Sequence, residues 1–166
     1  MTSIDLLPDI TVFQSTMSNQ TPSGVMHLTF NCFLMDSASP VLVHSGTVSQ
    51  VEQMLPLLRN RLSGRTLRYV FASHFESDEC GGVQLLKEHY PELVMLCSAN
   101  TARELAGFGM DIQPRIVRGG EVATDEGFSL QMIDYPSEAH LEKGLIAFEQ
   151  TRGLLFSSDL LGQIGL

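Results

Sequence analysis

A group of potential metal ligands lies in the short segment Ser73–Gly82. It contains one imidazole and three carboxylates within six residues: His74, Glu76, Asp78 and Glu79. Alternate positions of an extended or turning chain can aim several such groups at one centre, and imidazole with carboxylate oxygen suits divalent or trivalent first-row metals. The alternative is a solvated acidic loop, because acidic residues are mostly exposed on proteins. The segment alone supports both interpretations equally.

The flanking residues predict that this segment joins a strand to a helix. Leu67–Ala72 is largely apolar and contains β-branched and aromatic residues, as buried strands do, whereas the apolar residues of Val83–His89 have helical spacing. Gly81 and Gly82 would let the backbone turn sharply beside the ligands. Because open α/β sheets bind ligands in loops at the carboxyl ends of strands, we expect a functional loop here.

Two later residues have ligand side chains in similar positions. His140 follows Phe128–Tyr135, which has the composition of a strand, and Asp159 follows the apolar run Leu154–Ser158. Three predicted strand ends therefore each present a side chain that can bind a metal. This agreement favours a metal site over an acidic surface loop.

The combination of His74-x-Glu76-x-Asp78 with His140 and Asp159 resembles the metallo-β-lactamase superfamily, and specifically its flavodiiron branch. The general superfamily motif is His-x-His-x-Asp-His, and a Glu in the second position marks the diiron proteins. The resemblance covers most of the chain and implies an α/β (α+β) fold, the αββα sandwich, which we expect to be incomplete at its C-terminal end. It also implies that His74, Glu76 and His140 bind one iron ion. Asp78 would bind the other ion, and Asp159 would bridge both.

The sequence departs from the family pattern at the second metal. No histidine follows Asp159, although the pattern has one there, and Glu79 stands where the family often has histidine. We therefore expect a weaker second metal, with Glu79 as a further candidate ligand, or completion by solvent or by residues outside this sequence. Glu76 makes the site more anionic than an imidazole would, which favours iron over zinc.

Two classes of function are consistent with such a site. The first is a non-heme diiron protein that binds dioxygen or nitric oxide, as a redox or oxygen-sensing module or as a reductase. Nothing in the chain resembles a flavodoxin-like donor domain, so turnover would need an external electron donor protein; a sensor would need a signalling domain. The alternative is a zinc-dependent hydrolase, in which metals generate a hydroxide nucleophile. Glu76 counts against it, and no catalytic residue beyond the metal ligands is predicted.

Composition sets the remaining expectations. The 166 residues, 43% of them hydrophobic, predict one globular domain over residues 1–166. The net charge of −9 disfavours nucleic acid and anionic membranes as partners. Because the chain has neither a long apolar run nor a basic signal sequence, we expect a cytoplasmic protein without a membrane partner. The three cysteines include no C-x-x-C pair, which fits a reducing compartment; Cys80 is expected to be a packed residue rather than a reactive thiol.

The remaining elements are predicted from local patterns. Ile10–Gln14 and Val25–Met35 are expected to be strands separated by a polar turn, and Ser49–Leu62 a helix that Pro56 interrupts or kinks. His44 ends a short apolar strand; a hydrogen-bonded structural role is favoured, and an approach to the metal pocket is the alternative. The apolar, uncapped C-terminal residues predict either a fragment of a longer polypeptide or a partner subunit, such as a homodimer, that covers this side.

Overall fold

The computed structural model describes residues 1–137 and 142–161. Seven strands form a mixed sheet in sequential order: β1 (Thr2–Leu7), β2 (Ile10–Thr21), β3 (Gly24–Met35), β4 (Val41–Val43), β5 (Tyr69–Phe71), β6 (Val94–Cys97) and β7 (Arg115–Ile116). Neighbouring strands are antiparallel from β1 to β4 and parallel from β4 to β7. The sheet thus changes from an antiparallel opening to parallel strands joined by helices.

A second, antiparallel sheet has four strands in the order β11-β10-β9-β8. Its strands are β8 (Val122–Asp125), β9 (Phe128–Ser137), β10 (Glu142–Glu149) and β11 (Leu154–Phe156). The helices are α1 (Val48–Leu62), α2 (Ser77–Cys80), α3 (Val83–His89), α4 (Ala99–Gly107) and the 3-10 helix η1 (Ser158–Leu161). None of the helices in the described part of the chain is long and apolar enough to cross a lipid bilayer.

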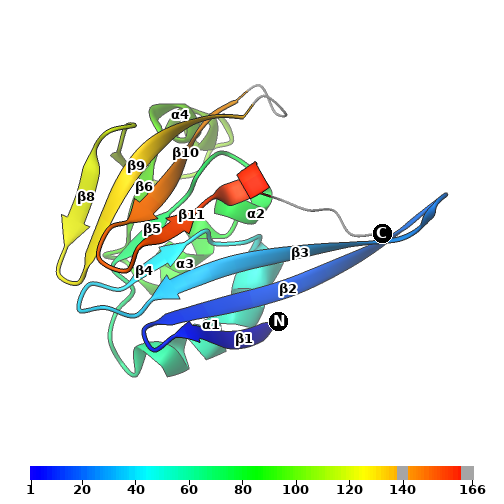
Figure 1. Cartoon of the computed structure of the whole chain (residues 1–166), viewed down its shortest axis with the longest axis horizontal. Helices are drawn as coiled ribbons and strands as arrows, with labels where there is room; N and C mark the ends of the chain where they lie inside the picture. Colours follow the sequence, from blue (N-terminus) through cyan, green and yellow to red (C-terminus); the bar gives the residue numbers. More distant parts are fainter. Residues whose placement is uncertain (138–141, 162–166) are drawn as a thin grey trace.

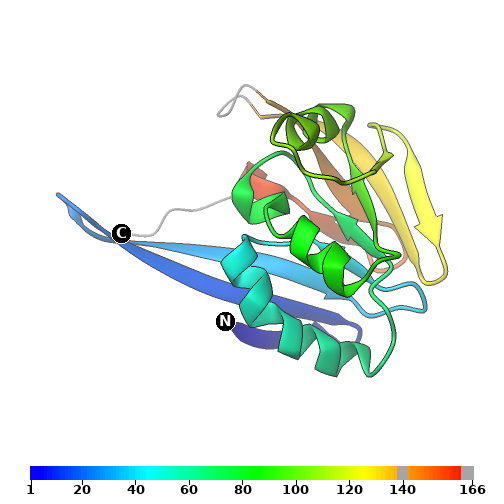
Figure 2. The same ribbon diagram turned by 180° about the vertical axis from the view of Figure 1, so that it is seen from behind.

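The described residues form three layers, with helices on one face of the first sheet and the second sheet on its other face (Figures 1 and 2). One apolar core joins the helices to the first sheet, for example through Leu42, Met54 and Leu58. A second core lies between the sheets and includes Phe71 and Leu130. This helix–sheet–sheet arrangement corresponds to three of the four layers of the predicted αββα sandwich.

Helix α1 begins with a capping box. The Thr47 hydroxyl accepts a hydrogen bond from the Gln50 backbone (3.3 Å), and the Gln50 side chain accepts one from the Thr47 backbone (2.7 Å). Pro56 lies inside this helix, which continues to Leu62. The helix was therefore predicted correctly, and the proline does not end it.

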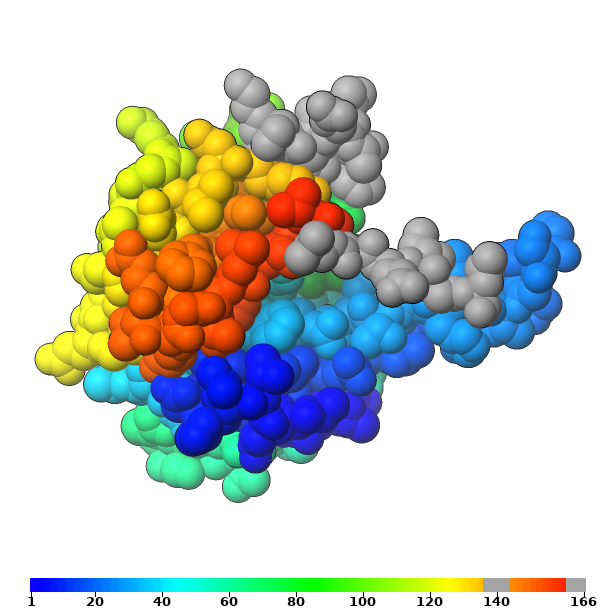
Figure 3. All heavy atoms as spheres, viewed as in Figure 1, coloured from blue at the N-terminus to red at the C-terminus, as the bar shows by residue number. Residues whose placement is uncertain are grey.

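The β2–β3 hairpin is longer than predicted. Strands expected to be separated by a broad polar turn instead pair up to Thr21 and Gly24, which leaves a two-residue loop. Polar side chains pair across this part, as Ser18 Oγ does with His27 Nδ1 at 2.8 Å. The outer part of β2, residues 16–20, is exposed on both faces, so it lacks the apolar alternation that marks a half-buried strand. The far end of the hairpin projects from the body of the molecule (Figure 3). Strand β1 was not predicted at all.

Candidate metal centre

His74 follows strand β5 and is held by two serines from different parts of the chain. Its side chain is 1% exposed, and its Nδ1 lies 3.0 Å from Ser73 Oγ and 3.4 Å from Ser158 Oγ. The two hydroxyls also hydrogen-bond each other at 2.8 Å. These contacts orient the ring so that Nε2 faces the carboxylates, which is how partners behind a metal-binding histidine usually act.

Three carboxylates from two further elements surround this nitrogen. His74 Nε2 lies 3.7 Å from Glu76 Oε2, 3.8 Å from Glu79 Oε2 and 3.4 Å from Asp159 Oδ2. These distances exceed ordinary hydrogen bonds. They suit neighbouring donors around one ion, since metal bonds of about 2.0–2.2 Å at tetrahedral or octahedral angles separate donors by roughly 3–3.5 Å.

The closest grouping consists of His74, Glu76 and Glu79, whose ligand atoms all lie within 4.8 Å of one another. Glu76 precedes helix α2 in an extended conformation, and Glu79 lies within that helix. Asp159 reaches the same region from η1, directly after β11. Residues that are far apart in sequence are thus brought to one place at the strand ends, as the motif predicted.

The environment of the Glu79 carboxyl favours a bound cation. Its carboxyl is buried, and Oε2 has no hydrogen-bond partner in the described part of the chain. Burial, followed by the negative charge of Asp78, raises the pKa of the Glu79 carboxyl to about 9. A buried carboxylate with other carboxylates beside it requires compensation. A bound metal ion would supply the positive charge, so the residues fit the metal centre that the motif implies.

Two of the predicted ligands, Asp78 and His140, receive less support from the structure than the others. Asp78 lines the same cavity as Glu79 and Asp159, but it is not part of the closest grouping. His140 lies outside the described residues, so its role stays a prediction. The two orienting serines were missed by sequence reasoning, although each directly precedes a predicted ligand in the sequence, Ser73 before His74 and Ser158 before Asp159.

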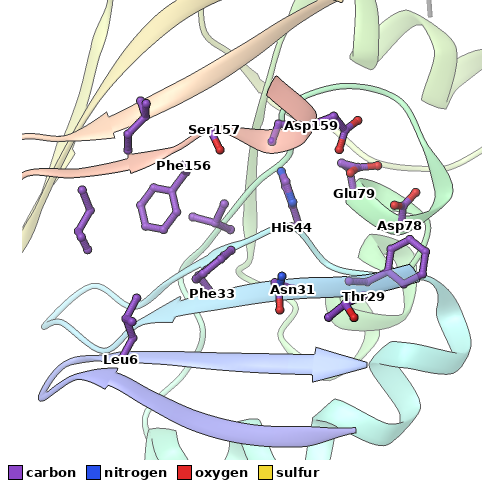
Figure 4. A pocket seen from close by; sticks show the side chains of 15 residues that line it. Leu6, Thr29, Asn31, Phe33, His44, Asp78, Glu79, Phe156, Ser157 and Asp159 are labelled. Atoms are coloured by element: carbon purple, nitrogen blue, oxygen red, sulfur yellow. The ribbon is translucent and has the colours of Figure 1, made fainter. Parts of the chain in front are cut away.

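A cavity of about 450 Å³ adjoins the carboxylates (Figure 4). Its walls comprise apolar residues from β1, β3, β4 and β11, polar residues from β3 and the end of β11, and His44 from the end of β4. Figure 4 shows the His44 ring between the β3 residue Asn31 and the carboxylate-bearing residues Glu79 and Asp159. The cavity gives a small molecule room beside the candidate metal centre.

His44 has a buried ring that forms no hydrogen bond with the described residues, so its favoured hydrogen-bonded structural role stays a prediction. Burial, together with the nearby His74, lowers the pKa of His44 to about 3. The imidazole is therefore neutral near pH 7, with one N–H donor and one acceptor nitrogen.

Cys80 is the packed residue that the sequence favoured. It is buried, and its Sγ lies 3.2 Å from the backbone oxygen of Glu76, to which it donates a hydrogen bond. Burial raises the pKa of the Cys80 thiol to about 12. The thiol is thus protonated near neutral pH, and its place at the end of α2 does not activate it.

The stability of the metal-free protein should fall as the pH rises from 6.5 to 9. Glu79 has its pKa raised from 4.5 to about 9, so across this range the folded state binds a proton that the unfolded state has lost. The free energy of unfolding then decreases by up to about 1.4 kcal/mol per pH unit. Below pH 6.5 the lowered pKa of His44 acts in the opposite direction, because the unfolded state binds the extra proton.

Urea denaturation of the metal-free protein at several pH values would measure this slope. The matched variant is Glu79→Gln, which cannot ionise and should show a much flatter dependence above pH 6.5. A parent protein whose unfolding free energy does not change between pH 6.5 and 9 would contradict the prediction.

Comparison with known proteins agrees with this geometry. A model of the family described as ODP family beta lactamase matches residues 28–165. A putative diflavin flavoprotein A 2 from Nostoc sp. is 22% identical over 136 residues, which make up 81% of this chain and 23% of that protein. The chain therefore spans about a quarter of the length of the curated relatives it matches.

Solved structures show the same fold. A flavo di-iron protein variant from Thermotoga maritima matches 99% of this chain and 43% of its own, with a TM-score of 0.83 and 17% identity. A metallo-beta-lactamase from Pontibacter korlensis matches 93% of this chain and 69% of its own, with a TM-score of 0.74 and 13% identity. The chain therefore belongs to the ODP family of beta lactamases and has the metallo-β-lactamase fold of the flavodiiron proteins, as its motif predicted.

Proposed function

We propose that this domain is a non-heme diiron protein that binds dioxygen or nitric oxide. The observation that carries the proposal is the crowding of three carboxylates around His74 Nε2 in a partly buried site. Hard carboxylate oxygens with few imidazoles favour iron over zinc. The names of its relatives, a diflavin flavoprotein and a flavo di-iron protein, support the same chemistry.

The proposed ligands are those that the resemblance of the motif to the flavodiiron branch implies. His74, Glu76 and His140 would hold one iron ion, Asp78 would hold the other, and Asp159 would bridge the two. The short distance from Glu79 to His74 supports Glu79 as a further ligand. When bound, the two ions would supply reversible ferrous–ferric redox chemistry. The residues themselves would hold the ions, while the serines behind His74 fix its ring.

The partners are also proposals. We infer an electron donor protein if the domain acts as a reductase, or a signalling domain if it acts as a sensor. A homodimer is proposed from the resemblance to the diiron branch. The three free, buried cysteines support function in the reducing cytoplasm.

Elemental analysis together with an ultraviolet–visible spectrum tests this proposal. The protein is purified without added metal, oxidised, reduced under anaerobic conditions and then exposed to air. The expected result is two irons per chain, with a charge-transfer absorption that bleaches on reduction and returns in air. Zinc with no such absorption would overturn the diiron proposal and favour the zinc hydrolase.

A further inference from the structure

The wall of the cavity beside the candidate metal centre contains the His44 ring, which has no hydrogen-bond partner among the described residues. His44 is 9% exposed, lines the cavity and has no hydrogen bond from its ring to a described residue. The ring nitrogens are not among the fully buried, unpaired side-chain atoms of the described residues, so they are accessible from the cavity. Such a group in a cavity wall points to a ligand that completes its hydrogen bonding.

The backbone holds His44 in an unusual conformation. Its φ is 63°, in the left-handed region that few residues other than glycine adopt. Its amide donates to the Phe71 carbonyl at 2.8 Å, and the next amide, that of Ser45, donates to the Glu79 carbonyl at 2.8 Å. His44 is therefore fixed between the end of β5 and the ligand helix α2. Strained residues held in this way tend to occur at functional sites.

Several other hydrogen-bonding groups in the cavity wall already have partners, whereas the Asn31 side-chain nitrogen and the Ser157 hydroxyl, like the His44 ring, form no hydrogen bond with the described residues. Ser158 Oγ contacts Ser73 Oγ, and Thr29 Oγ1 lies 3.4 Å from Thr16 Oγ1. Asn31 Oδ1 accepts a hydrogen bond from Gln14 at 3.0 Å, which anchors that amide. Carboxylates of the candidate metal centre can only accept hydrogen bonds when ionised. The His44 ring is thus a donor that remains available on the cavity side.

We propose that His44 donates a hydrogen bond to a small ligand bound in this cavity beside the metal centre, and so sets the affinity for that ligand. The ligand class is a diatomic or triatomic molecule or anion with an acceptor atom, because the cavity combines this donor with an apolar wall that includes Phe33 and Phe156. Apolar surroundings strengthen such a hydrogen bond. The inference rests on the proposed function, since it requires a metal in the site.

Azide titration of the oxidised, iron-loaded protein tests the inference. Azide is a triatomic anion, and its binding is followed by its charge-transfer absorption. We expect His44→Leu to bind azide about tenfold more weakly than the parent, equivalent to about 1.4 kcal/mol, with unchanged iron content. His44→Asn should show a similar loss. Because asparagine tolerates the left-handed backbone, this second variant separates loss of the ring from backbone strain.

His27→Leu is the matched control, because His27 is exposed on the hairpin and bonds only Ser18 there among the described residues. It should bind azide as the parent does. Iron-loaded His44 variants with the parent's azide affinity would overturn the role of His44 and leave the diiron proposal standing. A parent protein that takes up no metal would overturn both.

Discussion

Replacing His74 with alanine should abolish stoichiometric metal binding. His74 is the residue that all three neighbouring carboxylates face, and it supplies the imidazole of the closest grouping. Loss of residues that merely orient a ligand weakens metal affinity by about 10–100-fold, so loss of a ligand should cost at least as much. Metal content after dialysis, measured by elemental analysis, should fall from two ions per chain to one or none. Asp159→Ala should also lower the number of bound metal ions, because the carboxylate proposed to bridge them would be lost.

His89→Ala provides the control for both variants. His89 is exposed at the end of α3, where its Nδ1 lies 3.0 Å from an Arg59 nitrogen, away from the carboxylates. Its replacement should leave metal content unchanged. If His74→Ala and Asp159→Ala both retain the parent's metal content while remaining folded, the proposed site is wrong.

The ligand segment was predictable because its information is local. The strand before His74, the helix after it and the spacing of the ligands all lie within a short stretch of chain, and periodicity detects such elements. The outer part of β2 was missed because residues 16–20 are exposed on both faces and show no apolar alternation, whereas β3 was predicted over nearly its full length.

The surroundings of the ligands depended on contacts that no local pattern contains. Ser158 reaches His74 from the far end of the chain, and the sequence marks it only as a neighbour of Asp159. His44 was expected to be structural, because a lone histidine in an apolar strand usually is. Its place in the cavity wall follows from the parallel pairing of β4 with β5 and from the left-handed backbone at its own position. The candidate ligands that the structure brings together were thus predictable from the sequence, whereas the groups that orient them were not.

Gly82, which follows the ligand segment, illustrates the same difference between what local sequence and tertiary contacts reveal. The sequence suggested that Gly82 permits a sharp turn, but its φ is −91°, which any residue can adopt. Its real role is close packing: a Cβ at this position would lie 2.2 Å from Val51 Cγ2, 2.9 Å from the Gly46 oxygen and 3.1 Å from the Thr47 oxygen. The Gly82 amide also donates to the Gly46 carbonyl at 2.8 Å. The ligand helix is therefore seated directly on the loop that follows His44.

Gly82→Ala should consequently destabilise the protein by about 3 kcal/mol, at the upper end of the usual effect of overpacking, because two of the three contacts are with backbone. The shift of α2 away from the β4–α1 loop should also weaken metal binding. Urea denaturation gives the first quantity and metal titration the second. The matched control is Gly107→Ala at the end of α4, where a Cβ meets nothing within 4 Å. That variant should change stability by less than about 1 kcal/mol. Equal stabilities for the two variants would show that this contact does not hold α2 in place. Close packing at Gly82 would then not be what positions Glu76 and Glu79.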